Sequence, residues 1–518
     1  MTLFRTATLS ALLAGVPAAA APTGCESLAT LALPHVTISA AEARTTGEFT
    51  PPGGKPLRGL PGWCRVAGSI KPSADSDIRF EVWMPASNWN GKFRGIGNGG
   101  FAGSINFAGL GDAVLHGYAA ASTDTGHQAA GRDARWALRH PEKIIDFGYR
   151  AIHETTVAAK AIVRRFYGEA PRRSYFSSCS NGGRQALMEA QRFPADYDGI
   201  IAGAPANYWT HLMAGAAWDM KAMLAAPGGY ISAAKLPAIQ AAALAACDAA
   251  DAVKDGVIEN PAKCRFDPAV LLCKGPESDA CLTAPQVAAL KTVYAGLPKV
   301  LPGYSPGGEA EPGGWAGWIT GPEREKAAMF EFSTQFYKNM VYDNPEWDYR
   351  TFDAARDTQA ADGKMARILN STDPDLSAFK KRGGKLILYH GWSDAAIPAQ
   401  NAIDYYRSVT AKMGNAEATQ FVRLYMAPGM QHCGGGSGPN TFGQGATGNG
   451  DPKSDIGAAM EAWVEKGIAP REIVAEKRGA GNKVERTRPL CPYPQVARWK
   501  GTGSTDDAAN FVCAAPAR

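Results

Sequence analysis

SYFSSCSNGGRQALMEAQRF, residues 174–193, is the stretch that decides the fold expected for this chain. Residues 174–177 form a short apolar run typical of a buried strand, and residues 184–193 have the pattern of a helix. Ser180 lies on the turn between them, with small residues on both sides. This is the context of a nucleophile elbow, in which the serine hydroxyl is exposed beside an oxyanion-binding N–H group. Because Ser178 replaces the usual glycine of G-x-S-x-G, a helix-capping serine remains the alternative at this point.

Two further strands end at residues that complete a catalytic set. The apolar run 385–389 leads to Asp394, and the run 420–426 leads through a short loop to His432. The order serine, aspartate, histidine, each just past a strand, is that of α/β-hydrolases. We therefore predict that His432 takes the proton from Ser180 and that Asp394 fixes the imidazole tautomer.

His390 is the competing base, but it lies in the strand's end rather than on a following loop. We interpret it as a packed histidine beside the site. His153-Glu154 invites comparison with H-E-x-x-H, but Val157 stands where the second histidine is required, so a metalloprotease is not predicted.

The remaining part of the expected site is a glycine-rich loop, residues 97–100, directly after the strand predicted at 92–96. Glycines there let backbone N–H groups approach a ligand closely. Nucleotide-binding patterns are missing, since no G-x-x-x-x-G-K-[ST] occurs and no G-x-G-x-x-G opens a helix. We predict an oxyanion hole made by the backbone N–H of Asn181 with that of Gly99 or Gly100.

Composition and the N-terminus indicate an exported globular protein. The 518 residues are 45% hydrophobic and 20% charged. The net charge of +5 is small for this length and the basic residues are scattered, which does not favour nucleic-acid binding or a polybasic membrane anchor. Residues 1–21 have the pattern of a signal peptide, with an apolar run too short to span a bilayer and then alanines. Ten cysteines follow, and an even number in an exported chain predicts disulfides rather than zinc, because no C-x-x-C occurs.

The combined motifs resemble the tannase and feruloyl esterase family, which also contains mono(2-hydroxyethyl) terephthalate hydrolase. The resemblance rests on the segments 179–184 (CSNGGR), 391–394 (GWSD) and 431–433 (QHC). It implies an α/β fold, an α/β-hydrolase core in two parts, residues 22–207 and 375–518, interrupted by a lid domain, residues 208–374. It also implies the disulfide pairs Cys179 with Cys433, Cys25 with Cys64, Cys247 with Cys264, Cys273 with Cys281 and Cys491 with Cys513.

An acidic segment of the expected lid, residues 247–257 (CDAADAVKDGV), suits calcium, a hard cation with oxygen ligands. It is similar to the family's structural calcium loop. That similarity implies carboxylate ligands from Asp248, Asp251 and Asp255 and carbonyl ligands from Val253 and Val257. The EF-hand template is not met, and a solvated acidic turn is the alternative.

The lid also carries many aromatic residues, which could form a pocket for a phenolic acyl group or simply the lid core: Trp315, Trp318, Phe330, Phe332, Phe336, Tyr337 and Trp347. By resemblance, Ile397 is expected near the acyl pocket.

We therefore predict a secreted or periplasmic serine carboxylesterase that cleaves aromatic, feruloyl-type esters through an acyl-enzyme. Gallate esters, as in tannins, and terephthalate monoesters are the alternatives within this class. From other classes, we consider an inactive phenolic- or carbohydrate-binding protein on this scaffold and a metal-dependent hydrolase that uses the acidic loop. The expected partner is a small aromatic ester, free or linked to a polysaccharide or tannin, with no organic cofactor. The sequence leaves the natural ester and the oligomeric state open.

Overall fold

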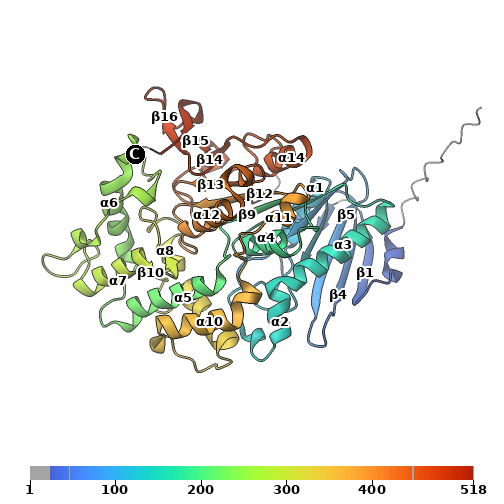
Figure 1. Ribbon diagram of the computed structural model, residues 1–518, viewed down its shortest axis with the longest axis horizontal. Helices are drawn as coiled ribbons and strands as arrows, with labels where there is room; N and C mark the ends of the chain where they lie inside the picture. The colour runs from blue at the N-terminus through green and yellow to red at the C-terminus, as the bar shows by residue number, and fades with distance from the viewer. Residues whose placement is uncertain (1–23, 46, 446–447, 517–518) are drawn as a thin grey trace, which may run out of the picture.

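A computed structural model describes residues 24–45, 47–445 and 448–516 of the chain (Figure 1). The predicted signal peptide, residues 1–21, lies outside the described residues. No helix among the described residues is long and apolar enough to cross a membrane.

A nine-stranded sheet forms the centre of the molecule. The strands run antiparallel from β1 to β7 and parallel from there to β13. In spatial order they are β1 (Val36–Arg44), β4 (Trp63–Ile70), β5 (Ile78–Pro85), β7 (Ala119–Thr123), β6 (Lys92–Ile96), β8 (Arg173–Cys179), β9 (Gly199–Gly203), β12 (Lys385–Gly391) and β13 (Val422–Ala427). The parallel strands expected before Ser180, Asp394 and His432 are thus β8, β12 and β13, and their carboxyl ends meet at one edge.

Helices cover both faces of this sheet, because its central strands are apolar on both sides. On β12, Leu386 and Leu388 face the core shared with helices α3 (Ala151–Tyr167), α4 (Asn181–Arg192) and α12 (Gln400–Met413). The alternate residues Ile387 and Tyr389 face the core shared with α14 (Ile456–Lys466), while α1 (Phe107–Leu115) packs on the same side at the antiparallel end. This alternation is the two-residue period of a strand.

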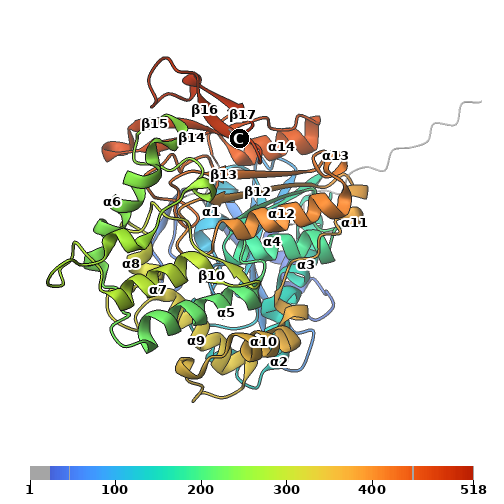
Figure 2. The same ribbon diagram turned by 60° about the vertical axis from the view of Figure 1, so that its left-hand side comes forward.

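No element between β9 and β12 joins the nine-stranded sheet in the described residues. All of them except α11 (Ser377–Lys381) lie in the predicted lid, which Figure 1 shows in green to yellow on one side of the sheet and Figure 2 shows turned forward. They are α5 (Trp209–Met220), η4 (Lys221–Ala225), η5 (Ala233–Lys235), α6 (Leu236–Cys247), η6 (Asp248–Asp251), η7 (Pro261–Lys263), η8 (Pro268–Leu271), α7 (Ala284–Ala295), β10 (Gly296–Leu297), β11 (Leu301–Pro302), α8 (Trp315–Trp318), α9 (Ala328–Phe336), η9 (Tyr337–Val341), η10 (Tyr349–Thr351) and α10 (Ala354–Leu369). The boundaries at 207/208 and 374/375 stay predictions.

The lid shares one apolar core with the edge of the sheet that carries the predicted site. That core joins lid side chains to Phe101 and Phe147 and to residues 395–397, which follow Asp394. The lid is therefore packed against the hydrolase core rather than tethered beside it.

Short elements complete the fold: η1 (Cys25–Thr30), β2 (Gly47–Phe49), β3 (Leu57–Leu60), η2 (Arg135–Ala137), α2 (Pro141–Ile145), η3 (Asp146–Arg150), α11 (Ser377–Lys381), α13 (Asn415–Ala418), β14 (Ile473–Arg478), η11 (Ala480–Asn482), β15 (Val484–Leu490), β16 (Val496–Trp499), η12 (Ala508–Asn510) and β17 (Phe511–Ala514). Five disulfides are present, with the pairing that the resemblance implied. The predicted fold class, a disulfide-rich α/β-hydrolase core with a large insertion, is confirmed.

Candidate active site

Ser180 occupies a strained turn between β8 and α4. Its backbone angles, φ 67° and ψ −127°, are ones that a residue with a side chain rarely adopts. The strain is held by backbone hydrogen bonds: the N–H donates to the oxygen of Gly203 at 2.9 Å, and the carbonyl accepts from Arg184 and Ala206 at 3.0 and 3.1 Å. The helix therefore begins at Asn181, earlier than the residues 184–193 expected from periodicity.

Ser178 explains why the glycines around the turn are needed. A Cβ placed on Gly182 would lie only 1.9 Å from the Ser178 hydroxyl oxygen, and one on Gly97 would lie 2.8 Å from it. A Cβ on Gly183 would lie 2.3 Å from the oxygen of Gly203, where α4 packs against the end of β9. Ser178 thus fills space that the usual elbow glycine leaves empty, and its neighbours are glycines in consequence.

The three predicted catalytic side chains form one hydrogen-bonded chain. His432 Nε2 lies 2.9 Å from the Ser180 hydroxyl oxygen, and its Nδ1 lies 2.8 Å from Asp394 Oδ2. Such a chain assigns the Nδ1 hydrogen to the aspartate side and leaves Nε2 to accept from the serine. The geometry is therefore that of a base poised to accept a hydroxyl proton.

Asp394 is fully buried and held on every side. Its Oδ1 accepts from the backbone N–H groups of Ala396 and Ile397 at 2.8 and 2.9 Å. The Nε2 of His390 lies 3.2 Å from its Oδ2. Burial raises the pKa of Asp394, but the charges and hydrogen bonds of His432 and His390 lower it further, so that its pKa lies well below the ordinary value. Asp394 stays ionised beside the base.

A disulfide joins the neighbours of the predicted nucleophile and base. Cys179, just before Ser180, is bonded to Cys433, just after His432, across a sequence separation of 254 residues. The Cα atoms are 5.9 Å apart. The glycine-rich loop that begins at residue 434 is thereby preceded directly by a residue bonded to the elbow.

The predicted oxyanion-hole residues lie on the two loops beside Ser180. Among the hydrogen bonds of the described residues, none is donated by the backbone N–H of Asn181, Gly99 or Gly100. The loop is held instead through its neighbours: the Phe101 N–H donates to Gly131 at 2.7 Å, and the Ala102 N–H donates to Gly99 at 2.9 Å. Gly100 has a φ of 55°, and a Cβ there would lie 2.2 Å from the Gly131 oxygen. These N–H groups remain available to a ligand, while their role stays a prediction.

Arg184 holds the turn at Ser180 in place through hydrogen bonds to other segments, a role that the sequence did not reveal. Its guanidinium is fully buried, and it donates hydrogen bonds to uncharged oxygens: the Asn181 side chain at 2.8 Å and the carbonyls of Phe147, Gly148 and Leu369 at 3.0, 2.8 and 3.2 Å. Burial lowers the pKa of Arg184 to about 9. One side chain thus connects the first turn of α4 to η3 and to the end of the lid helix α10.

Lid residues border His432. Trp318 meets the imidazole edge-to-face with ring centroids 5.0 Å apart and stacks on Phe332 at 6.3 Å. The other predicted pocket aromatics belong mainly to the lid core: Tyr337 and Trp347, for example, are buried and stack on each other. Ile397 is buried in the same apolar core. Aromatic surface therefore lies against the predicted base, contributed by α8 and α9.

The lid also clamps the loop that carries His432. Gln431 donates from its amide nitrogen to the carbonyl of Gly308 at 2.7 Å, and the carboxylate of Glu311 accepts from the Ser437 N–H at 2.9 Å. Burial raises the pKa of Glu311, which these hydrogen bonds partly offset. Sequence reasoning missed this clamp, because nothing in residues 304–315 marks a partner more than a hundred residues away.

The acidic loop of the lid has calcium-type donors but an incomplete cage. Asp248 accepts from the N–H groups of Asp255 and Gly256 at 3.3 and 3.1 Å, which closes the loop. Asp255 forms ion pairs with Arg488 at 2.7 Å and Arg486 at 3.2 Å. The carboxylates of the loop do not converge as a group of three in the described residues. Carboxylate and carbonyl oxygens on one short turn are the type of ligand that calcium prefers. To bind the ion, however, the Asp255 side chain would have to rotate away from Arg486 and Arg488.

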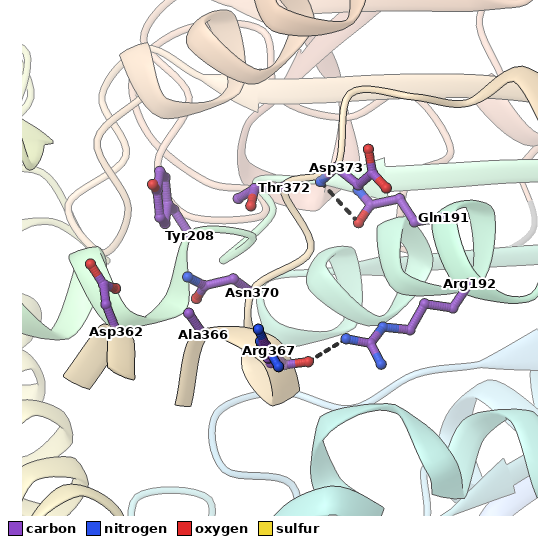
Figure 3. Close-up of a pocket in the computed structure, with 9 residues that line it drawn as sticks. All are labelled: Gln191, Arg192, Tyr208, Asp362, Ala366, Arg367, Asn370, Thr372 and Asp373. Carbon is purple, nitrogen blue, oxygen red and sulfur yellow. Dashed lines mark hydrogen bonds between the residues drawn. The ribbon is translucent and has the colours of Figure 1, made fainter. Parts of the chain in front are cut away.

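A groove lies away from these residues. It encloses about 530 Å³ where the ends of α4 and α10 meet, and it contains none of Ser180, Asp394 and His432 (Figure 3). Several of its polar groups bond to one another: Arg192 donates to the carbonyl of Arg367, and the Asp373 N–H donates to Gln191 at 3.3 Å. We therefore do not assign the reaction to this groove.

Comparison with known proteins shows the family of the chain. Residues 64–514 match the family model described as tannase and feruloyl esterase. The chain is 45% identical to an uncharacterized esterase of Xanthomonas campestris pv. campestris, over 98% of this chain and 94% of that protein. It is 35% identical to the mono(2-hydroxyethyl) terephthalate hydrolase of Piscinibacter sakaiensis, over 88% and 85%.

Among solved structures, the crystal structure of feruloyl esterase B from Aspergillus oryzae superposes with a TM-score of 0.88 at 30% identity, covering 95% of this chain and 99% of that one. The chain therefore belongs to the tannase and feruloyl esterase family of carboxylic ester hydrolases.

Proposed function

We propose that this esterase is an exported serine hydrolase that cleaves esters of aromatic acids through an acyl-enzyme on Ser180. The observation that carries the proposal is the hydrogen-bonded chain from Ser180 through His432 to the buried Asp394. Its arrangement is the one expected when a base activates a hydroxyl and a carboxylate stabilises the resulting imidazolium.

In the first half of the reaction, His432 accepts the Ser180 proton as the oxygen attacks the ester carbonyl. The N–H of Asn181 and that of Gly99 or Gly100 stabilise the developing oxyanion. His432 then gives the proton to the leaving alcohol, and water attacks the acyl-enzyme in the same way. Asp394, whose pKa is held low, remains the anion that opposes the imidazolium charge.

For the acyl group, we propose a hydroxycinnamate of the feruloyl type. Trp318 and Phe332 support it, because their rings form an apolar surface next to His432. A gallate ester presents more hydroxyl groups that would need hydrogen-bond partners there. A terephthalate monoester is the second candidate, supported by the 35% identity to a hydrolase of that name.

Export is supported by the five disulfides, which form and persist in oxidising compartments. We also propose a calcium ion at the acidic loop, bound by Asp248, Asp251, Asp255 and the carbonyls of Val253 and Val257. Bound there, the ion would stabilise the lid without taking part in the chemistry, since the catalytic chain involves none of these residues. Arg488 competes with it for Asp255.

The experiment that tests the function compares wild type with Ser180→Ala on methyl ferulate, methyl gallate, a terephthalate monoester and p-nitrophenyl acetate. We expect Ser180→Ala to lose about 10⁴-fold or more in kcat on every ester that wild type cleaves. An organophosphonate should label wild type at Ser180 only. Activity of Ser180→Ala within tenfold of wild type would reject the assignment, and the ranking of kcat/KM values decides the acyl group.

A further inference from the structure

A histidine and two carboxylates meet on the face of the sheet that α3 and α4 cover, outside the site described above. His153 comes from α3, Glu189 from α4, and Asp196 from the connection between α4 and β9. One ligand atom of each lies within 4.8 Å of those of the other two. His153 Nδ1 lies 2.7 Å from Asp196 Oδ2, and the imidazole stacks on Phe193 at 3.8 Å, which fixes its orientation.

Glu189 makes this cluster different from an ordinary histidine–aspartate pair. The residue is 1% exposed, and neither carboxylate oxygen accepts a hydrogen bond from a donor group among the described residues; a hydrogen bond with Asp196 would require one of the two carboxyls to keep its proton. A buried carboxylate without a partner is costly, so such groups are normally paired or coordinate a metal. Its oxygen faces the ligand atoms of His153 and Asp196.

From this geometry we propose that His153, Glu189 and Asp196 bind a divalent metal ion of the zinc class. One imidazole nitrogen and two carboxylate oxygens are a common zinc donor set, and the two negative charges balance the ion. The His153 side chain is 29% exposed, so the fourth position faces the open side and water completes the coordination.

The ligand atoms need little movement to accept the ion. Donor atoms around a tetrahedral zinc with bonds of about 2.0–2.1 Å lie about 3.3 Å apart. The separations here, from 2.7 Å to at most 4.8 Å, bracket that value. Lys160 donates to the backbone oxygen of Asp196 and forms no ion pair with either carboxylate in the described residues, although its positive charge acts on both.

The role follows from where the ligands lie. Glu189 follows Ser180 by nine residues along α4, roughly 13 Å. The ion would therefore join α3, α4 and the approach to β9, and would act on stability rather than on ester chemistry. The rival explanation is a proton shared by Glu189 and Asp196 with no metal bound.

The test is zinc binding by the full-length mature chain without a histidine tag. A chelator and desalting give the zinc-free protein; when zinc is added back and the excess removed, we expect about one Zn²⁺ per chain by elemental analysis and a gain of a few degrees in Tm. His153→Ala and Glu189→Gln should each weaken zinc binding by about 100-fold or more. Esterase activity of the zinc-loaded and zinc-free wild type should be the same.

Two variants serve as controls. His140→Ala removes a histidine from an exposed pair with Asp75, at 3.0 Å, that belongs to no three-ligand group in the described part of the chain, and the variant should bind zinc like wild type. Asp251→Asn separates this site from the acidic loop and should also retain the zinc. Wild type that holds no zinc at micromolar free concentration, or His153→Ala that holds as much as wild type, would show a proton-sharing carboxyl pair and overturn the proposal.

Discussion

Removing the Cys179–Cys433 disulfide should damage catalysis more than any other cysteine change in the chain. The bond joins the residue before Ser180 to the residue after His432, so it holds the 2.9 Å contact between serine and imidazole. Without it, the loop after the histidine begins with Gly434-Gly435-Gly436, whose conformational freedom is large. We propose the double variant Cys179→Ala/Cys433→Ala as the perturbation.

The expected magnitude has two parts. The chain-entropy model gives about 5.5 kcal/mol of stability for a loop with the observed separation of 254 residues, against about 2.5 kcal/mol for the separation of 8 between Cys273 and Cys281. Shorter disulfides inside the large loop change this little, since the dependence is logarithmic. For catalysis, a displacement of the imidazole by about 1 Å costs about 100-fold in kcat, with a smaller change in KM.

The assay has to separate the two parts. Unfolding is followed by circular dichroism, and kcat and KM are measured on p-nitrophenyl acetate at a temperature where both proteins are fully folded. The rate of organophosphonate labelling reports the serine–imidazole contact without a bound acyl substrate. The matched control is Cys273→Ala/Cys281→Ala, which removes a lid disulfide and should lower Tm but leave kcat within about threefold of wild type.

Two results would refute this reasoning. If the Cys179/Cys433 variant kept its kcat while losing stability, the disulfide would hold the fold without positioning the base. If the Cys273/Cys281 control lost as much kcat, the effect would come from general loosening of the lid.

Three further predictions concern single residues. Asp394→Asn should lower kcat about 10⁴-fold. The pKa of Asp394 is depressed in the folded protein, so its ionised carboxylate stabilises the fold fully above its unfolded pKa of about 3.9, and this stabilisation is lost as pH falls through the folded pKa. The difference in unfolding free energy between wild type and variant should therefore narrow in unfolding curves measured at acid pH. Arg184→Lys should lower Tm, because a lysine cannot donate to all three carbonyls that the guanidinium binds and each buried carbonyl left without a donor costs about 1–3 kcal/mol. An unchanged melting curve would show that Arg184 does not stabilise the turn in this way. Asp251→Asn should abolish a calcium-dependent rise in Tm without changing kcat. If the Tm of wild type does not change on calcium addition, the calcium proposal is wrong.

The sequence by itself determined the elements of the core and the identity of the site residues that local patterns mark. Apolar runs such as 385–389 fall on parallel strands because a strand buried on both faces requires apolar side chains throughout. The residues after three such strands meet because parallel strands end at the same edge. Family motifs at 179–184 and 431–433 then pointed to the disulfide and to the pairing of Ser180 with His432.

Only the tertiary structure decided which distant groups touch. The elbow begins its helix at Asn181 because backbone hydrogen bonds with Gly203 at the end of β9 and with Ala206 after it hold Ser180 at a positive φ, which no local propensity indicates. His390 contacts Asp394 because the chain folds back after β12. The cluster of His153 with Glu189 and Asp196 has no sequence signature, because its members come from α3, α4 and a loop that only packing brings together. The periodicity of apolar residues shows which face of a helix or strand is buried, whereas long-range packing decides which element that face contacts.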